Sequence, residues 1–350
     1  MKVIGVMSGS SLDGIDICCV SFDPSDWTWS LESGITVTLP EHIKLGLSEI
    51  TFATPWILAE LESKYSQFMA QSLLTYMESN EVEPDAIGIH GHTILHSPQW
   101  KTSWQLINGG MVTSLCQVPV VCDFRNQDMA LGGQGTPMAV IADRDLFPGY
   151  DYYINLGGIA NISCHHLGQW MAFDLCPCNQ LLNHYSQLLG MLYDSHGRLA
   201  SDGRINGQLL SELLTDGYLA SPPPKSIDNT WIKETVIPSI DKYDLTPTDT
   251  LRTLVEYVIT VIHNNLREAS CSVLVTGGGA YNSFMMELLR NKCAEKGSKI
   301  MIPDSELIDY KEAILIAYCA ALRLLKKPNF VSSATGASTD VIGGALYLPN

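Results

Sequence analysis

The fold is decided by the stretch Met7-Ser8-Gly9-Ser10-Ser11-Leu12-Asp13-Gly14-Ile15-Asp16 near the start of the chain. Apolar runs at Val3–Met7 and Ile15–Phe22 meet at its turn of small residues, and they predict two strands. A third run, Ile35–Leu39, alternates between apolar and polar residues and predicts another strand. The chain therefore opens with an antiparallel meander, in contrast to the strand–helix opening of a dinucleotide-binding unit.

The turn in this stretch has residues that suit an anion site. Gly9 and Gly14 let the backbone approach an anion closely, and the hydroxyls of Ser10–Ser11 add donors. Asp13 or Asp16 can hold a hydrated magnesium ion next to phosphates. The alternative is an ordinary hairpin turn that contains an aspartate.

A second meander begins about half-way along the chain. The runs Tyr152–Leu156, Ile159–Cys164 and Trp170–Phe173 predict three short strands joined by tight turns. This repetition indicates two α/β halves, and we expect a small-molecule cleft between them. The expected domains are 1–147, to which 330–350 can belong, and 148–329.

Several helices are predicted from apolar residues at helical spacing. The clearest spans 55–79, with Thr54 as its N-cap and Pro55 as its first residue. A helix at 248–267 has Thr248 as its expected cap, and a helix at 311–325 is apolar nearly all round. Further helices are expected at 179–189, 204–214 and 281–295, and further strands at Ala86–Ile89, Trp104–Ile107, Val118–Val121, Val273–Thr276 and Lys299–Ile302.

The composition limits the class of protein. The 350 residues carry a formal net charge of −16, which repels nucleic acid phosphates and anionic membranes, so we expect neither as a partner. The ten cysteines follow no secretion signal, which favours free thiols in a reducing cytoplasm. The longest apolar stretch, Ala313–Leu325, is interrupted by Arg323 and is shorter than the roughly 18 residues of a membrane-spanning helix.

Two more glycine turns lie further along the chain. Asn155-Leu156-Gly157-Gly158-Ile159-Ala160-Asn161-Ile162 joins two of the predicted strands. Val275-Thr276-Gly277-Gly278-Gly279-Ala280-Tyr281-Asn282 runs from a strand through three glycines towards a helix. Glycines leave room for a purine or ribose, and a helix N-terminus favours phosphate.

Together the three glycine turns resemble the two phosphate motifs and the adenosine motif of the acetate kinase/hexokinase/actin superfamily. Four other stretches resemble the anhydro-N-acetylmuramic acid kinase family more narrowly, and the resemblance covers essentially the whole chain. It implies an α/β fold with two RNase H-like (actin/hexokinase-type) domains, whose mixed sheets flank an interdomain cleft. The four stretches are Gly91-His92-Thr93-Ile94, Val121-Cys122-Asp123-Phe124-Arg125, Gly132-Gly133-Gln134-Gly135-Thr136-Pro137 and Ala334-Thr335-Gly336-Ala337.

The resemblance also implies the cofactors and partners. These are ATP, Mg²⁺ with Asp13 as a ligand, a small amino-sugar substrate and a second copy of the chain in a homodimer. The residues expected to bind the cofactor are Gly9, Ser10, Ser11, Leu12, Asp13, Gly14, Asp16, Asn155, Gly157, Gly158, Asn161, Gly277, Gly278, Gly279 and Asn282.

The reaction that the resemblance implies needs a carboxylate base. Water opens the 1,6-anhydro bridge of anhydro-N-acetylmuramic acid, and the released O6 takes the γ-phosphoryl group of ATP, within peptidoglycan recycling. Asp174 matches the family's base, and Glu312 is a second acidic group near the sugar or else only stabilises a helix N-terminus. Leu175, Cys176 and Cys178 depart from the family's pattern, two of them at glycine positions.

Substrate contacts are expected at polar residues of the narrower motifs. Arg125 can bind the lactyl carboxylate of a muramic sugar, or can form a plain salt bridge with Asp123. On a strand, His90 and His92 would share one face, and together with His96 they could bind a metal. The other interpretations are a substrate contact and structural histidines. Half a metal site is likewise one interpretation of Cys176-Pro177-Cys178. The residues expected to bind substrate are His92, Thr93, Asp123, Arg125, Gly133, Gln134 and Asn179.

Two other functions fit part of the sequence. One is a conventional sugar or carboxylate kinase, in which Asp174 deprotonates an acceptor hydroxyl. The other is an inactive nucleotide-binding relative, suggested by the altered residues 175–178. The sequence has no Gly-x-x-x-x-Gly-Lys-Ser/Thr motif, which disfavours a P-loop kinase, and no Gly-x-Ser-x-Gly motif, which disfavours an α/β hydrolase.

Overall fold

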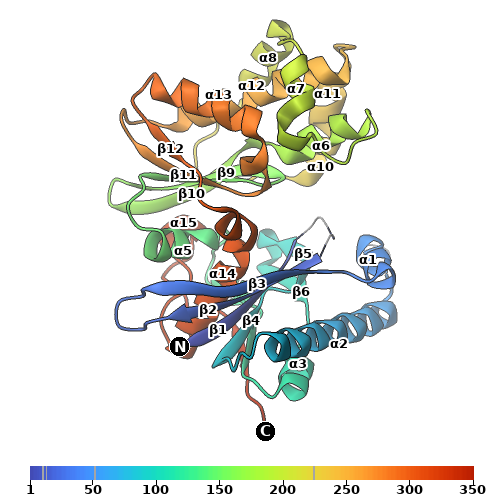
Figure 1. Cartoon of the computed structure of the whole chain (residues 1–350), viewed down its shortest axis with the longest axis vertical. Helices are drawn as coiled ribbons and strands as arrows, with labels where there is room; N and C mark the ends of the chain where they lie inside the picture. Colours follow the sequence, from blue (N-terminus) through green and yellow to red (C-terminus); the bar gives the residue numbers. More distant parts are fainter. Residues whose placement is uncertain (10–11, 13, 51–52, 224) are drawn as a thin grey trace. The chain divides into compact units, whose positions relative to one another are not determined.

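The computed structural model describes residues 1–9, 12, 14–50, 53–223 and 225–350. Its contacts divide the chain into two compact units, drawn in Figure 1. Unit 1 consists of Met1–Pro148 and Asp309–Asn350, and unit 2 of Gly149–Ile308. The chain thus returns to unit 1 earlier than at residue 330, where the sequence analysis placed the change.

Unit 1 is built on a six-stranded mixed sheet with the order β13-β7-β4-β1-β2-β3. The first three strands form the expected antiparallel meander, and β4 and β7 then run parallel to β1. Strand β3 begins at Trp29, before the predicted start at Ile35, and none of its residues is buried, so its apolar signal in the sequence is weak. The strands are β1 Lys2–Ser8, β2 Gly14–Phe22, β3 Trp29–Thr38, β4 Ala86–Ile89, β7 Val120–Cys122 and β13 Ala345–Tyr347.

The longest helix of unit 1, α2 (Pro55–Ser79), has the predicted bounds and the predicted cap. Thr54 Oγ1 accepts a hydrogen bond from Ile57 N at 3.4 Å, and Pro55 occupies the first turn. Its apolar stripe, which includes Tyr65 and Leu73, packs in the unit's core. The remaining elements are α1 Glu41–Ser48, α3 Gly109–Cys116, α4 Asn126–Ala130, α5 Ala139–Leu146, α15 Ser332–Thr335, the hairpin β5 His92–Ser97 and β6 Thr102–Leu106, and the short η2 Pro98–Trp100.

Helix α14 (Ser305–Leu324) is held in unit 1 by a close approach to the sheet. A Cβ atom on Gly5 of β1 would lie 2.8 Å from Ala317 N, and one on Gly88 of β4 would lie 2.6 Å from Ile316 O. Only glycine allows a helix backbone to pack this closely on a strand. The predicted burial of this helix is confirmed, since Ala313 to Leu322 are all buried. Its place in unit 1 corrects the sequence analysis, which put it in the second half.

Unit 2 repeats the strand arrangement of unit 1. Its five-stranded sheet has the order β10-β9-β8-β11-β12, in which an antiparallel meander is followed by two parallel strands. This order matches the β7-β4-β1-β2-β3 part of unit 1 read in reverse. The shared topology confirms two RNase H-like domains with mixed sheets. The strands are β8 Tyr152–Leu156, β9 Ile159–His166, β10 Gln169–Pro177, β11 Ser272–Thr276 and β12 Lys299–Met301.

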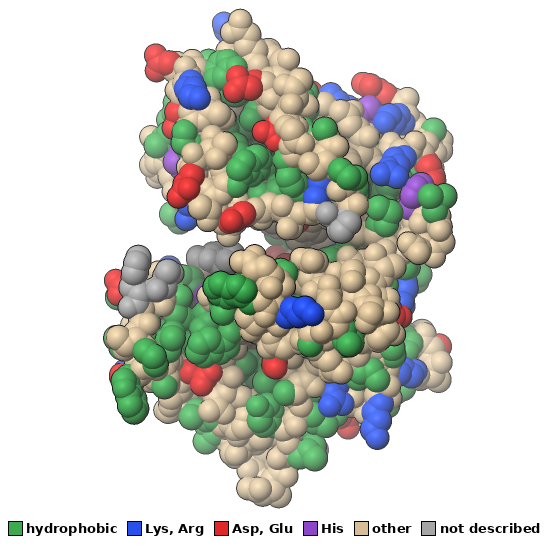
Figure 2. Space-filling model, turned by 180° about the vertical axis from the view of Figure 1, so that it is seen from behind, with side chains coloured by type: hydrophobic (Ala, Val, Ile, Leu, Met, Phe, Trp, Pro, Cys, Tyr) green, Lys and Arg blue, Asp and Glu red, His purple; other side chains and the backbone are tan. Residues whose placement is uncertain are grey.

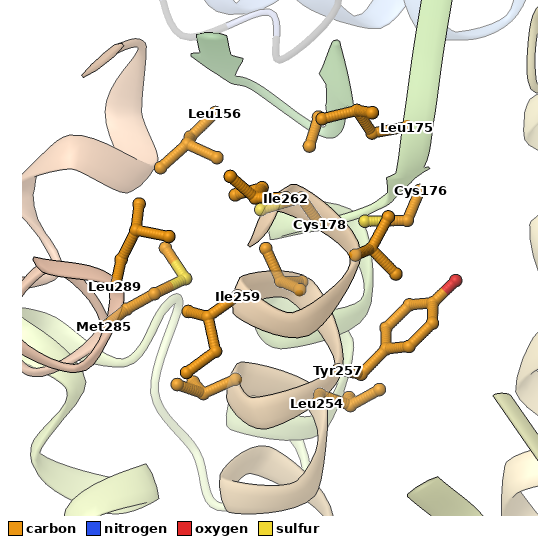
Figure 3. Close-up of a cluster of buried hydrophobic side chains, with 14 of the residues drawn as sticks. Leu156, Leu175, Cys176, Cys178, Leu254, Tyr257, Ile259, Ile262, Met285 and Leu289 are labelled. Atoms are coloured by element: carbon orange, nitrogen blue, oxygen red, sulfur yellow. The ribbon is translucent and has the colours of Figure 1, made fainter. Parts of the chain in front are cut away.

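Helix α12 (Pro247–Asn265) forms the centre of the core of unit 2 (Figures 1 and 3). Its cap is Thr246, whose Oγ1 accepts from Asp249 N at 3.2 Å, so the predicted cap Thr248 is wrong. Pro247 explains the difference, because proline lacks an N–H and favours the first helical position. The other elements are α6 Asn179–Gln187, η3 Ser195–Gly197, α7 Arg198–Asp202, α8 Gly207–Leu214, α9 Gly217–Ala220, α10 Asn229–Trp231, η4 Ile232–Val236, α11 Ile237–Asp241, η5 Gly278–Tyr281 and α13 Ser283–Ala294.

The charged side chains that the structure describes do not gather into a large patch of one sign on the face that Figure 2 shows. There the described Lys, Arg, Asp and Glu side chains lie scattered among apolar ones in both units. Within the described residues, no helix combines the length and the hydropathy that crossing a bilayer requires.

Candidate functional site

Asp174 lies in unit 2, on β10, where the strand has a bulge before Cys176. One carboxylate oxygen, Oδ2, accepts a hydrogen bond from Ile227 N at 2.9 Å. Burial raises the pKa of Asp174, and the hydrogen bond from Ile227 offsets part of this rise. The carboxyl group is therefore held in place through one oxygen, and it takes up a proton more readily than an exposed aspartate.

Helix α9 and the segment that follows it hold the backbone around Asp174. Asp174 N donates to Lys225 O at 3.1 Å, and the Tyr218 hydroxyl donates to Asp174 O at 2.8 Å. The Lys225 ammonium donates to Tyr218 O at 3.0 Å and to Leu219 O at 3.1 Å, and it lies 4.6 Å from the centre of the Tyr218 ring. Lys225 and Tyr218 thus support Asp174, a role that no motif in the sequence had indicated.

The residues that depart from the family's pattern lie in the core of unit 2 and not at its surface. Leu175, Cys176 and Cys178 are each at most 1% exposed, and Figure 3 shows them among side chains of α12 such as Tyr257 and Ile262. None of the three has a positive φ, and Cys178 has φ −130°. The backbone conformation at these three positions therefore does not require glycine.

The turn between β8 and β9 lies against the start of α6. Cys178 N donates to Gly158 O at 2.9 Å, and Asn179 N donates to Gly157 O at 3.1 Å. The Asn179 side chain donates from Nδ2 to Leu156 O at 2.8 Å. The predicted substrate residue Asn179 therefore holds the glycine turn that was predicted to bind phosphate. The other predicted residues of this turn, Asn155 and Asn161, face each other as a β8–β9 pair.

The three glycines Gly277–Gly279 lie directly after β11, beside the same turn. Gly277 has φ +82°, and a Cβ atom there would lie 2.9 Å from the backbone of Leu156. Glycine is therefore required at this position. Asn282 was predicted to bind the cofactor, but its Oδ1 accepts from Met285 N at 3.0 Å and caps α13. In unit 2, Asp174, Asn179 and the two glycine turns thus lie around the carboxyl end of β8 and β11 and the end of β10.

The opening motif lies at the turn from β1 to β2 in unit 1. Its predicted residues Ser10, Ser11 and Asp13 lie outside the described residues. Leu12 has φ +58°, and its N–H donates to Gly9 O at 3.5 Å. Gly14 is the first residue of β2, where a Cβ atom would lie 2.7 Å from Val37 O.

Two carboxyl groups of unit 1 lie near this motif. Asp16 Oδ1 accepts from Thr36 Oγ1 at 2.6 Å, and burial raises the pKa of Asp16. The Glu312 side chain is exposed at the surface of the unit, but many protein atoms surround it. This desolvation raises the pKa of Glu312, and the negative charge of Asp16 adds to the rise. Lys311, the neighbour of Glu312, forms an ion pair of 2.8 Å with the buried Asp143 of α5. This pair fixes the turn of α14 that presents Glu312.

Arg125 is paired with His90 and not with Asp123. Its Nη2 lies 2.8 Å from His90 Nε2, while His90 Nδ1 lies 2.9 Å from Gly91 O. A guanidinium can only donate, so His90 Nε2 accepts and Nδ1 donates, which makes His90 neutral. Burial and the charge of Arg125 lower the pKa of His90 to about 3. Burial also lowers the pKa of Arg125 to about 10, and its buried Nε has no partner among the described residues.

His90 and His92 do not share a strand face, which corrects the sequence analysis. Strand β4 ends at Ile89, Gly91 has φ +75°, and β5 begins at His92. His92 is 8% exposed, and burial lowers the pKa of His92. Its Nδ1 has no partner within the part of the chain that the structure describes. A buried nitrogen of this kind suits a ligand contact.

Asp128 is a buried carboxylate that the sequence analysis missed. Its Oδ2 accepts from Gly135 N at 2.8 Å, and its Oδ1 accepts from Thr335 Oγ1 at 2.7 Å. Gln134 N donates to Thr335 O at 2.9 Å, and a Cβ atom on Gly133 would lie 2.6 Å from the Asp128 carboxyl carbon. Asp128 therefore fastens the Gly-Gly-Gln-Gly loop to the start of the last segment of unit 1, and it leaves the Gln134 side chain exposed.

Two other features of the described residues lie apart from these groups. The described part of the chain contains no cluster of three or more His, Cys, Asp or Glu side chains suited to a metal ion. A cavity of about 190 Å³ in unit 1 has none of the predicted site residues in its lining. Its Asp145 already binds Arg144 and the Tyr318 hydroxyl, and its Lys327 lies over the Trp27 ring. The cavity is therefore separate from the predicted site.

Comparison with known proteins identifies the family. Residues 1–349 match the family described as anhydro-N-acetylmuramic acid kinase. Proteins of that name from Coxiella burnetii and Haemophilus influenzae are 32% and 31% identical to the chain, over 99% and 98% of it and 97% of each relative. The one from Rhodopseudomonas palustris is 31% identical over the full length of both. A solved ROK family glucokinase from Streptomyces griseus gives a TM-score of 0.43 at 15% identity, over 91% of this chain and 98% of the glucokinase. The chain belongs to the anhydro-N-acetylmuramic acid kinase family.

Proposed function

We propose that this kinase opens the 1,6-anhydro ring of anhydro-N-acetylmuramic acid with water and transfers the γ-phosphoryl group of ATP to O6. The observation that carries the proposal is the environment of Asp174. Ile227 N–H holds one carboxylate oxygen, and burial raises the pKa of Asp174. A carboxylate of this kind is oriented and is more basic than an exposed one, as a general base requires.

In the proposed step, the oxygen of water bonds to the anomeric carbon while Asp174 takes the proton of the water. The bond between the anomeric carbon and O6 breaks, O6 bonds to the γ-phosphorus, and ADP leaves. The products are N-acetylmuramic acid 6-phosphate and ADP, and Asp174 then returns its proton to solvent. Lys225 and Tyr218 keep the backbone at Asp174 fixed, which preserves the line of attack.

The glycine turns are proposed to bind ATP. Membership in a kinase family supports ATP as the phosphoryl donor. These turns contain Gly9 and Gly14 in unit 1, and Gly157–Gly158 and Gly277–Gly279 in unit 2, and their backbone N–H groups are the proposed phosphate donors. Asn179, which holds the turn in unit 2, then acts through the glycine backbone.

Magnesium is proposed as the second cofactor. Desolvation raises the pKa of Glu312, and the negative charge of Asp16 adds to the rise; a divalent cation beside Asp16 would relieve this second, repulsive part. Carboxylates together with water and phosphate oxygens are the ligands that Mg²⁺ prefers. When bound, the ion would neutralise phosphate charge. Asp13, the predicted ligand, lies outside the described residues.

The sugar is proposed to bind at Arg125 and His92 in unit 1. Arg125 keeps a buried Nε without a partner, and His92 keeps a buried Nδ1 without a partner, among the described residues. A guanidinium recognises a carboxylate strongly, which suits the lactyl group of a muramic sugar. Thr93, Asp123, Gly133 and Gln134 are proposed to complete the sugar site.

The ring opening is tested by the origin of the anomeric oxygen. The protein, ATP and Mg²⁺ are incubated with 1,6-anhydro-N-acetylmuramic acid in ¹⁸O-labelled water, and the phosphorylated product is analysed by mass spectrometry at early times. One ¹⁸O atom in the sugar and none in the phosphoryl group are expected. A phosphorylated product that keeps its anhydro bridge would instead support the conventional kinase. Nucleotide binding without any product would support the inactive relative.

A cytoplasmic homodimer completes the proposal. The cytoplasm is favoured by the free cysteines, and the homodimer rests on the family resemblance alone. Sedimentation equilibrium of the full chain should give twice the mass of one chain. A single-chain mass over the micromolar range would contradict it.

A further inference from the structure

The hairpin of β5 and β6 carries a buried hydrogen-bond acceptor without a partner. Gln105 on β6 is 7% exposed. Its Nε2 donates to Ser103 Oγ at 2.6 Å and to Thr93 Oγ1 at 3.4 Å, while Oε1 has no partner among the described residues. An unpaired buried acceptor costs stability, so a native protein that keeps one usually has a use for it.

Gln105 lies in a chain of hydrogen bonds between two predicted substrate residues, all within unit 1. At one end is Thr93, which Gln105 contacts directly. On the other side, Ser103 N donates to Asn126 Oδ1 at 2.8 Å, and Asn126 Nδ2 donates to Asp123 Oδ1 at 2.6 Å. The amide of Gln105 is therefore held in a defined orientation next to the proposed sugar-binding groups.

We propose that Gln105 is a specificity-determining contact for the sugar, whose Oε1 accepts a hydrogen bond from a hydroxyl or amide N–H of the substrate. This inference rests on the proposed function, and it adds a residue that no motif in the sequence had singled out. An oriented, buried acceptor favours a sugar that offers a donor at that position. It rejects an analogue that lacks the donor, because the acceptor then stays unpaired.

The variant Gln105→Met tests the proposal, because methionine keeps the length of the side chain and removes the acceptor. Isothermal titration with 1,6-anhydro-N-acetylmuramic acid, without nucleotide, gives the Kd of the sugar. We expect the Kd to rise about 10-fold or more. The thermal midpoint of the free protein should change little, because the loss of the two hydrogen bonds from Nε2 is offset by the removal of an unpaired buried acceptor. Gln71→Met, on the exposed side of α2, is the matched control and should leave both values unchanged.

The outcomes separate this inference from the proposed function. If the wild type binds the sugar and Gln105→Met binds it equally well, Gln105 is not a contact, while the proposed function stands. If the thermal midpoint of Gln105→Met falls and its sugar Kd stays that of the wild type, the residue is structural and the inference is overturned. If the wild type does not bind the sugar at all, the proposed function fails and the inference fails with it.

Discussion

Replacement of Gly5 by alanine should disturb the packing of α14 on the sheet of unit 1. The new Cβ atom would lie 2.8 Å from Ala317 N and closer still to the Ala313 carbonyl oxygen, whereas ordinary contacts begin at 3.4 Å. The helix must therefore move by roughly half an ångström or more to reach an ordinary contact distance. Overpacking of this size costs about 1–3 kcal/mol. In a domain of this size, that corresponds to a fall in Tm of roughly 2–4 °C per kcal/mol.

The same movement should also slow the reaction, because it displaces Glu312, which precedes Ala313 in α14. A misplacement of about 1 Å can cost on the order of 100-fold in rate, so we expect ADP release to slow at least about tenfold. Urea unfolding and coupled ADP release with the anhydro-sugar measure the two effects. Gly207→Ala is the matched control, because no atom lies within 4 Å of its added Cβ. Equal stability and equal turnover in Gly5→Ala and Gly207→Ala would refute the reasoning.

Three further predictions concern buried polar groups. Asp128→Ala removes the acceptor of Gly135 N–H and should lower the free energy of unfolding in urea by about 2–4 kcal/mol. Asp128→Asn retains one acceptor and should lower it less. Equal losses in the two variants would contradict the described hydrogen bonds. The pKa of His90 is about 3 in the folded protein, so below pH 6.5 only the unfolded chain binds a proton at His90. The free energy of unfolding of the wild type should therefore fall towards pH 4 more steeply than that of His90→Gln. Parallel curves for the two proteins would contradict this. Because the pKa of Asp174 is raised and the base must be ionised, the acid limb of kcat/KM should lie above pH 3.8, and a limb at or below that value would contradict the described environment.

Much of the fold could be predicted from local patterns. Thr54-Pro55 followed by apolar residues at helical spacing gave the bounds of α2, and the two meanders followed from short apolar runs separated by glycine turns. These signals lie within a few residues of one another, so the sequence alone carries them. The resemblance to the kinase family likewise came from short motifs, and the match over residues 1–349 confirms it.

The errors arose where contacts between distant residues decide the structure. Helix α14 belongs to unit 1 because Gly5 and Gly88 let it approach β1 and β4, and no local pattern contains that contact. Its first residues, from Ser305 to Glu312, mix Leu307 and Ile308 with charged residues and are not buried, which concealed its start. The predicted cap Thr248 is wrong because Pro247 takes the first helical position, which makes Thr246 the cap.

The candidate site could be predicted residue by residue, but the support around it could not. Asp174 and Arg125 were expected from motifs, whereas the partners of their side chains, Ile227 and His90, lie 53 and 35 residues away. The departures at Cys176 and Cys178 resemble changes in a phosphate loop when only the sequence is considered, but both side chains lie in the core of unit 2 with residues of α12, which are distant in sequence.

Asp174 is proposed as the base that activates water. The most direct test is single-turnover ADP release with 1,6-anhydro-N-acetylmuramic acid in wild type and Asp174→Asn. Asparagine can still accept from Ile227 N–H, so the fold and sugar binding should be retained. We expect the rate of Asp174→Asn to be lower by about 100-fold or more, the size expected for loss of a general base. A wild-type rate in Asp174→Asn would contradict it.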